Sequence, residues 1–461
     1  MKKLLSLILI FFLIVQTPIT ANAFIFGGLS VKDEKEMGYK FNLMIKSNMA
    51  IIEDPEISQY AKYILNRLTK PLKGQIFTFN ANVILHNALN AFAIPGGYVY
   101  IFTGLMMNVN GEDELAGVLA HELAHVTQRH VASRLERAQF VTVGALLLAI
   151  AGIAIGGASG GNIALGATAA GQAAMLNYSR LDETEADQIG LQYLIAAGYP
   201  AKGMVGGFKI LRQKSWMSGM NIPTYLSTHP AIGDRINGLT ARIQTMPLEI
   251  QNRNFDNTRF LRVKTLLWAR YGDEQAALQL FKKDDGLSYM GQAMVYARQN
   301  NVTKAAQSFD LAISKSPNDP LILREAGIFH YRKGNTKKAE QLLSSSIRKD
   351  PRDYMAIFFY ARLMDETGRE KEAPKYYIEV LRHIPEDPEV HESYAKSLGK
   401  AGNTLDAYIH MTYSALYANN KRQTEKYFKK AQSLSEKSSN KHNFQKLEKA
   451  YNERKEIWEK S

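Results

Sequence analysis

Two histidines and a glutamate with the spacing of a metal site occur in the segment His121-Glu122-Leu123-Ala124-His125. The surrounding residues, from Asp113 to Ala138, contain few helix breakers and predict one helix. Residues i and i+4 share a helix face, so both imidazoles can reach a single ion, and Zn²⁺ suits such ligands. Glu122 lies about 100° around the helix, where it can meet a water on that ion. The segment therefore predicts a hydrolytic metal site, although so short a match also arises by chance on a polar helix face.

A zinc site needs a third protein ligand, and the segment from Ser179 to Gly190 offers a candidate. Glu183 and Asp187 are four residues apart on a second predicted helix. Glu183 could bind the ion, while Asp187 accepts the other N–H of a ligating imidazole. His130 follows His121 by nine residues, about 180° around a continuous helix, which predicts a position at the surface or behind a ligand. Without the two histidines, either acid would be interpreted as part of a solvated helix face.

The composition restricts the chemistry further. The chain has 461 residues, of which 46% are hydrophobic and 22% charged, a globular balance with room for two or three domains. It has no cysteine, which excludes disulfides, thiolate metal sites, iron–sulfur clusters and a cysteine nucleophile. The net charge is +13, but no compact basic motif precedes the C-terminal tail, so we expect no nucleic-acid partner.

Residues 1–23 have the pattern of a secretory signal peptide. Lys2 and Lys3 precede an apolar run from Leu4 to Val15, and Ala21-Asn22-Ala23 supplies a small-x-small cleavage site. We therefore expect cleavage after Ala23 and export from the cytoplasm. The alternative is an uncleaved membrane anchor, although the run is short for a spanning helix.

A second apolar stretch, from Phe140 to Ala158, is long enough by itself to span a membrane. It continues as Gly/Ala-rich sequence to Met175, without the basic flank of an anchor. This favours a buried or membrane-touching hairpin. An integral membrane protease anchored by this stretch is the alternative.

An internal repeat of 34 residues organises the second half of the chain. The residues that recur at this period are Ala293, Gly327, Ala361, Ala395; Ala305, Ala339, Ala373, Ala407; Gly334, Gly368, Gly402; and Pro317, Pro351, Pro385. Small residues let paired helices approach closely, Gly ends the first helix, and Pro lies between repeats. The pattern resembles the tetratricopeptide repeat over about residues 287–420, with a degenerate earlier unit from Trp268 to Phe281. Such arrays form a superhelix with a concave binding face.

These patterns predict an α+β, mainly α protein in four parts. We expect a signal peptide (1–23), a zinc metallopeptidase domain with a small β-sheet edge (24–250), an α-solenoid of tetratricopeptide repeats (257–434) and a charged C-terminal helix or tail (435–461). The basic runs after Lys421 are typical of a solvated helix face. Contact with an anionic membrane or an acidic partner is the alternative.

The HExxH motif, followed by Glu183 in an ExxxD pattern after Ser179-Arg180, resembles the metallopeptidases related to HtpX and the CAAX prenyl proteases. Two more segments are similar to that family: Asn90 to Tyr100 before the motif, and Thr228-His229-Pro230 with Arg235 after it. The resemblance implies one Zn²⁺ held by His121, His125 and Glu183, with Glu122 as general base and Asp187 orienting a ligand. It also implies that His229 and Arg235 lie over the site. His229 would hold the transition-state oxyanion or cap the zinc at rest.

Gly96 and Gly97 predict a tight turn, so that Phe92 to Ile94 would form an edge strand. An edge strand can pair with an extended peptide and give affinity without much sequence preference. The resemblance thus implies that Asn90, Phe92, Ala93 and Ile94 bind substrate. An ordinary hairpin is the alternative, and the two interpretations are compatible.

With the leader and the repeats included, the layout resembles periplasmic members of that family that act in outer-membrane protein assembly. The resemblance implies an endopeptidase that hydrolyses misassembled envelope proteins. It also implies repeats that bind the assembly machinery, with peripheral membrane contact as an option. The alternative is a chaperone or scaffold that acts mainly through its repeats, with a gated or silent protease site. The intact HExxH and Glu183 argue against a dead enzyme but not against a gated one.

Overall fold

The computed structural model describes residues 29–137, 178–217, 224–437 and 441–460. These residues form a mainly helical structure with one three-stranded sheet, which confirms the predicted α+β, mainly α class. The expected signal peptide (1–23) and the apolar stretch 140–158 lie outside the described residues. In the described part of the chain, every helix is too short or too polar to cross a membrane.

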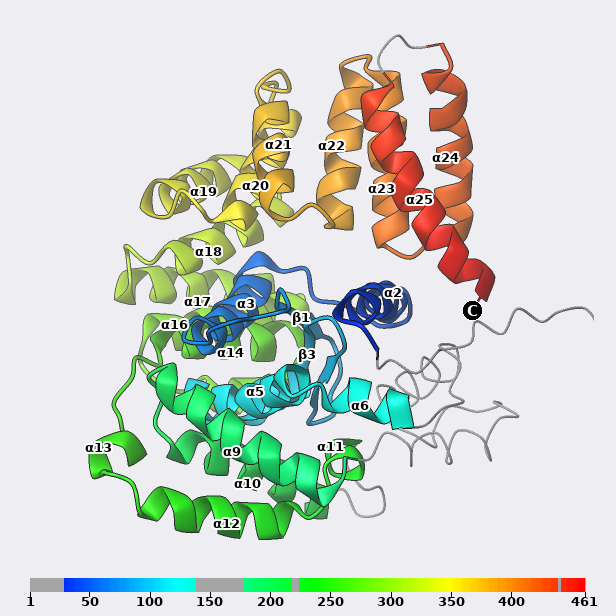
Figure 1. Cartoon of the computed structure of the whole chain (residues 1–461). Helices are drawn as coiled ribbons and strands as arrows, with labels where there is room; N and C mark the ends of the chain where they lie inside the picture. Colours follow the sequence, from blue (N-terminus) through cyan, green and yellow to red (C-terminus); the bar gives the residue numbers. More distant parts are fainter. Residues whose placement is uncertain (1–28, 138–177, 218–223, 438–440, 461) are drawn as a thin grey trace, which may run out of the picture.

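The sheet has the strand order β1-β3-β2, so β2 lies at an edge (Figure 1). Strand β1 (Asn80–Ile84) pairs in parallel with β3 (Tyr98–Phe102), and β2 (Ala91–Ile94) pairs antiparallel with β3. The turn between β2 and β3 contains Gly96 and Gly97 at φ +84° and +92°. Only glycine adopts such angles without strain, so the predicted tight turn is present.

Alternating residues of β3 pack into two different clusters, as the two-residue period of a strand requires. Tyr100 and Phe102 pack with Phe41 of helix α2 (Val31–Asn48), which covers one face of the sheet. Val99 and Ile101 enter the main core on the other face. The sheet is therefore covered on both faces.

Helix α5 (Glu112–Thr127) lies at the centre of the N-terminal part (residues 29–251), against the sheet on one side and against α9 and α10 on the other. The other helices of this part are α3 (Pro55–Thr69), α4 (Thr103–Asn108), α6 (His130–Arg137), α9 (Arg180–Ala196), α10 (Lys202–Met217), α11 (Thr224–Thr228), α12 (Ile232–Gln244) and α13 (Leu248–Gln251). A Cβ on Gly117 of α5 would lie 2.5 Å from the backbone of Met204. A Cβ on Gly190 of α9 would lie 2.9 Å from the carbonyl oxygen of Ala120. Glycine therefore allows both helices to approach α5 at backbone distance.

The expectation of one continuous helix from Asp113 to Ala138 is wrong. Helix α5 ends at Thr127, and α6 begins at His130. Between them Arg129 adopts φ +56°, a left-handed conformation that ends a helix. The break turns the chain, so angular positions counted from His121 do not apply beyond Thr127.

The second half of the chain consists of antiparallel helix pairs. They are α14 (Thr258–Tyr271), α15 (Glu274–Leu280), α16 (Gly286–Arg298), α17 (Val302–Lys315), α18 (Pro320–Arg332), α19 (Thr336–Lys349), α20 (Tyr354–Glu366), α21 (Ala373–His383), α22 (Pro388–Lys400), α23 (Thr404–Tyr417), α24 (Lys421–Ser435) and α25 (His442–Lys460). Gly334, Gly368 and Gly402 follow the first helix of successive pairs at φ +75° to +80°, as the period predicted. The segment containing Trp268 forms the pair α14 and α15, in keeping with a degenerate repeat.

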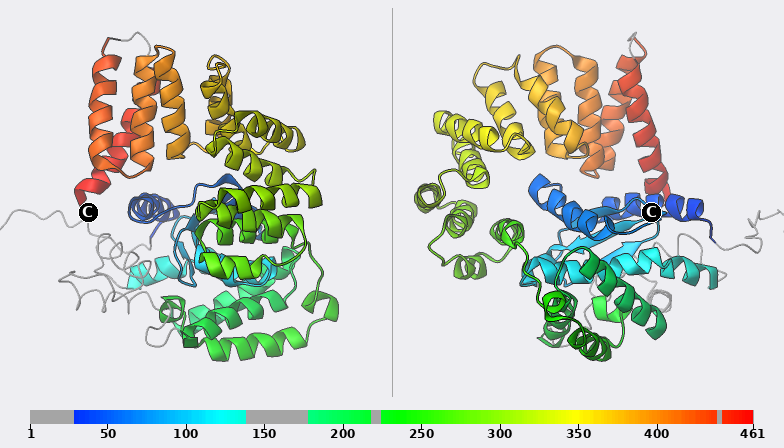
Figure 2. Two further views of the ribbon diagram at one scale, coloured as in Figure 1. Left: turned by 180° about the vertical axis from the view of Figure 1, so that it is seen from behind. Right: turned by 60° about the vertical axis from the view of Figure 1, so that its left-hand side comes forward.

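The helix pairs form an arch whose two ends both contact the N-terminal part (Figures 1 and 2). At the near end, the main core continues from the N-terminal part into the repeats without interruption. Buried Arg324 of α18 also pairs there with Glu56 of α3, at 3.4 Å. At the far end, Arg454 of α25 donates a 2.8 Å hydrogen bond to the hydroxyl of Ser47 in α2. Helix α25 therefore returns to α2.

Candidate metal centre

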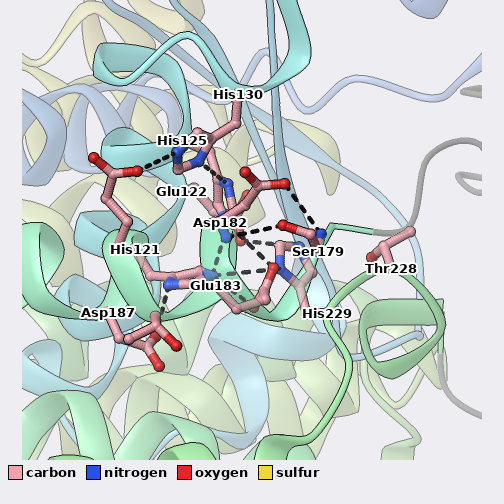
Figure 3. A network of polar contacts seen from close by, with 12 residues as sticks. His121, Glu122, His125, His130, Ser179, Asp182, Glu183, Asp187, Thr228 and His229 are labelled. Carbon is pink, nitrogen blue, oxygen red and sulfur yellow. Dashed lines mark hydrogen bonds and ion pairs between the residues drawn. The ribbon is translucent and has the colours of Figure 1, made fainter. Parts of the chain in front are cut away.

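Helix α5 places His121, Glu122 and His125 in the interior of the N-terminal part, each at most 1% exposed (Figure 3). Alanine, leucine and valine fill most of the remaining positions of this helix, and every residue from Leu115 to Val126 is buried. The Nε2 atoms of His121 and His125 lie 3.0 Å apart. The two imidazoles thus converge on one point, as the four-residue spacing predicted.

Helix α9 supplies the carboxylate. Its first turn is set by a capping box, in which the Ser179 hydroxyl and the Asp182 carboxylate each accept from the other's backbone N–H. The next residue, Glu183, points at the two imidazoles, with its oxygens 3.5 Å from His121 Nε2 and 3.4 Å from His125 Nε2. Close packing of α9 on α5 at Gly190 brings the carboxylate within reach.

A fourth side chain, His229, joins this group. Its Nδ1 atom lies 2.9 Å from Glu183 and 3.3 Å from His121 Nε2. Potential ligand atoms of His121, His125, Glu183 and His229 all lie within 4.8 Å of one another. Two buried imidazoles, a carboxylate and a third imidazole form a donor set that suits a zinc ion.

Two tyrosines that the sequence analysis did not single out hold these rings in place. Tyr225 stacks on His229 with ring centroids 4.3 Å apart, and Tyr178 stacks on His125 at 3.7 Å. The backbone N–H of Tyr178 also donates to the carbonyl of Thr228, which ties the start of α9 to the His229 segment. The position of Tyr225, one helical turn before His229, was the signal available in the sequence.

Asp187 and Arg235 form a buried layer behind the ligand candidates. Asp187 lies 3.0 Å from His121 Nδ1, and Arg235 donates to both carboxylate oxygens of Asp187, at 2.9 and 2.7 Å. Arg235 also pairs with Glu183. Burial and the charge of Arg235 act to lower the pKa of His121. The hydrogen bonds of His121 to Asp187 and Glu183 outweigh both effects and raise that pKa to about 9. The 3.0 Å contact places Asp187 to hold a proton on Nδ1, which would leave Nε2 for a bound ion.

Glu122 and Glu183 occupy opposite electrostatic environments. Burial acts to raise the pKa of Glu183, but His229, His121 and His125 outweigh it and hold that pKa far below its usual range. Burial raises the pKa of Glu122 above its usual value. Both carboxylate oxygens of Glu122 are buried without a hydrogen-bond partner in the described residues. A buried carboxylate left in this state beside a donor set is suited to accept a proton from a water molecule.

The structure places His130 behind the centre. Its Nδ1 atom lies 2.8 Å from Nδ1 of His125, and its other nitrogen lies 3.3 Å from Glu185. The angular position of His130, counted from His121 along a continuous helix, was wrong, because the helix breaks at Arg129. Of the two positions left open for it, the one behind a ligand is correct and the surface is not, since His130 is 4% exposed.

The four residues expected to bind substrate lie on or next to the edge strand. Ala93 and Ile94 line a small recess together with His125 and Arg129, so the edge strand borders the centre. Phe92 instead packs on Tyr100 with ring centroids 4.9 Å apart, on the face that α2 covers. Asn90 is buried at the start of the strand, and its side-chain nitrogen has no hydrogen-bond partner in the described residues.

A larger hollow of about 510 Å³ lies between α9 and α12. Its lining includes Glu183, Asp187 and Arg235 from the centre itself. The sequence analysis did not predict this feature, because no motif marks it.

Comparisons with known proteins agree with this geometry. A family model described as Peptidase family M48 matches residues 53–243. Two models described as Tetratricopeptide repeat match residues 274–320 and 330–397. The metalloprotease YcaL of Escherichia coli (strain K12) is 31% identical over 192 residues, which cover 40% of this chain and 71% of that protein.

Two relatives carry the name beta-barrel assembly-enhancing protease. The Escherichia coli (strain K12) protein is 32% identical over 234 residues, covering 49% of this chain and 47% of that protein. The Yersinia pestis protein is 30% identical over 259 residues, covering 54% and 51%. The chain thus spans about half of the length of these two relatives.

Among solved structures, a tetratricopeptide-repeat protein with an unusual peptide-binding site, YrrB, matches 37% of this chain and 91% of that chain. The identity is 14% and the TM-score 0.30. At such a score, the repeat assignment rests on the helix pairs and on the family models.

Proposed function

The chain belongs to peptidase family M48, and from this membership we propose that it is a zinc-dependent endopeptidase of the cell envelope. The observation that carries the proposal is the buried carboxylate of Glu122, which accepts no hydrogen bond within the described residues, beside the buried group of His121, His125 and Glu183. These three residues would hold the ion. Zinc, when bound, would polarise the scissile carbonyl and lower the pKa of a water molecule to about 7.

The residues of the chain would perform the proton transfers. Glu122 accepts a proton from the attacking water and passes it to the leaving amine. Asp187 keeps His121 in the tautomer that presents Nε2, and Arg235 fixes Asp187 in place. Arg235 also compensates the charge of Glu183, which otherwise would be costly to bury.

His229 would act as a gate. Its Nδ1 atom lies among the ligand atoms, and its Nε2 atom lies 3.6 Å from Glu122. The ring therefore fills space that the attacking water and the substrate carbonyl need. We expect His229→Ala to raise the rate at which an unfolded protein is cleaved, with unchanged zinc content. A loss of cleavage in this variant would instead assign His229 to the transition-state oxyanion.

Substrates and partners are proposed from the relatives named for β-barrel assembly. The peptidase would hydrolyse misassembled outer-membrane proteins in the periplasm, and the repeat arch would bind these proteins or their assembly machinery. An arch that carries a continuous core into the peptidase part would present bound proteins close to the centre. The edge strand β2 would pair with an extended segment of the substrate.

Cleavage of an unfolded model protein by the purified chain tests the proposed function. We expect about one zinc per chain, loss of cleavage when a chelator removes it, and recovery when zinc is returned. Cleavage that continues at the same rate after complete metal removal would contradict the proposal. Zinc binding without any cleavage, in both the wild type and His229→Ala, would favour a chaperone or scaffold role.

A further inference from the structure

Two glycines of α12, Gly233 and Gly238, lack the packing reason that other glycines near the centre have, and only Gly238 lines a hollow. In α5, α9 and α10, a Cβ added to Gly117, Gly190 or Gly203 would meet backbone within 3 Å. Gly238 lies in the middle of α12 and has no positive φ, and an added Cβ would meet no atom of the described residues within 4 Å. Glycine in a helix interior costs about 1 kcal/mol relative to alanine. Neither backbone conformation nor close packing explains this residue.

Gly238 lies instead on the wall of the hollow between α9 and α12. Pro230, Ala231 and Leu239 form an apolar part of that wall, and Arg180 and Arg242 also line it. Its volume of about 510 Å³ is within the range of sites that bind small ligands or side chains. A large side chain at position 238 would stand in this hollow, whereas glycine leaves it open.

The hollow adjoins the proposed metal centre through shared residues. Glu183 and Arg235 belong to both, and Glu183 lies within 3.5 Å of both ligand histidines. The edge strand borders the centre beside His125. A peptide bound at the centre would therefore lie next to Glu183, which also lines the hollow.

We propose that this hollow is a specificity pocket for the substrate side chain next to the scissile bond, and that Gly238 keeps it open. Its apolar wall suits a large apolar side chain, such as leucine, methionine or phenylalanine, while the arginine side chains can add aliphatic contact and keep their charges hydrated. The inference rests on the proposed peptidase function.

The test compares Gly238→Phe with a matched control in the same helix. Gly233→Phe is that control, because a Cβ on Gly233 also meets nothing within 4 Å but Gly233 does not line the pocket. The probes are peptides that differ only in the residue on either side of the cleaved bond, which is alanine, leucine or phenylalanine. The preference for the large residue is measured as kcat/KM. It is also measured as Kd in an inactive Glu122→Gln background.

We expect Gly238→Phe to reduce the preference for phenylalanine over alanine by about tenfold or more, and Gly233→Phe to leave it unchanged. Zinc content and thermal unfolding show whether each variant is folded. If Gly238→Phe does not fold, Gly238→Ala takes its place, and this smaller change should keep the preference for phenylalanine. If all variants cleave with the same preference, the proposed specificity pocket is contradicted while the proposed peptidase function stands. If no variant cleaves, but only Gly238→Phe loses the preference measured as Kd, the proposed peptidase function is contradicted while the proposed pocket stands.

Discussion

Glu122 and Glu183 are two buried glutamates in one site. Their different surroundings suit them to different roles. Glu183 faces three imidazoles and a guanidinium, so it stays ionised and can hold a cation. Glu122 has no hydrogen-bond partner in the described residues, and burial raises its pKa, so it can take up a proton. A pair of acids with opposite pKa shifts is the pattern expected of a ligand and a general base.

Removal of the Glu183 carboxylate tests its part in this division. We expect Glu183→Ala to lose most of its zinc, because the two remaining imidazoles form an incomplete site. Gln192→Ala, on the same helix but with an exposed side chain, is the control and should keep the metal. The metal content of both variants is measured after dialysis. A full complement in Glu183→Ala would place the third ligand elsewhere.

At the scale of helices, the site depends on how closely α9 approaches α5. Spacing within each helix could be predicted from the sequence, because the helical period alone brings His121 and His125, or Glu183 and Asp187, onto one face. The packing of α9 against α5 could not be predicted from the sequence, because it depends on contacts between glycines and residues far apart in the chain. The break at Arg129 was also missed, since neither glycine nor proline marks it.

Gly190→Ala tests this approach. The added Cβ would lie 2.9 Å from the carbonyl oxygen of Ala120, so α9 must move away from α5 and take Glu183 with it. We expect a loss of about 1–3 kcal/mol in stability, together with weaker zinc binding. Gly238→Ala is the control, because it meets nothing within 4 Å and should gain about 0.5–1 kcal/mol. Urea unfolding and zinc titration measure both effects. Equal results for the two variants would contradict the account.

At the scale of the whole molecule, the far end of the arch contains a pair of histidines, His391, which is buried, and His410, which is half-buried. The Nδ1 atoms of His391 in α22 and His410 in α23 lie 2.8 Å apart, and His391 donates its other N–H to the carbonyl of Pro385. Tyr417 packs on His391 and lines the hollow of about 410 Å³ between α2 and the last repeats. Burial lowers the pKa of His391 to about 4, and burial with the charge of His391 lowers that of His410 to about 3.

This pair makes the stability of the far end depend on pH. Both histidines are neutral in the folded state, while the unfolded chain protonates them below about pH 6.5. Stability is therefore full above that value and falls as the pH drops toward 4. We expect a loss of about 2 kcal/mol or more between pH 7 and pH 5. A His391→Phe, His410→Phe double variant should lose less, as urea unfolding at each pH would show. The same loss in the double variant would contradict this assignment.

Zinc content and peptide cleavage, measured on the same samples of wild type and Glu122→Gln, test the central claim most directly. Glutamine keeps the shape of the side chain but accepts no proton from water, and Glu122 is not among the proposed ligands. We predict about one zinc per chain in both proteins and cleavage of an unfolded protein by the wild type alone. Cleavage by Glu122→Gln at the wild-type rate would contradict the claim.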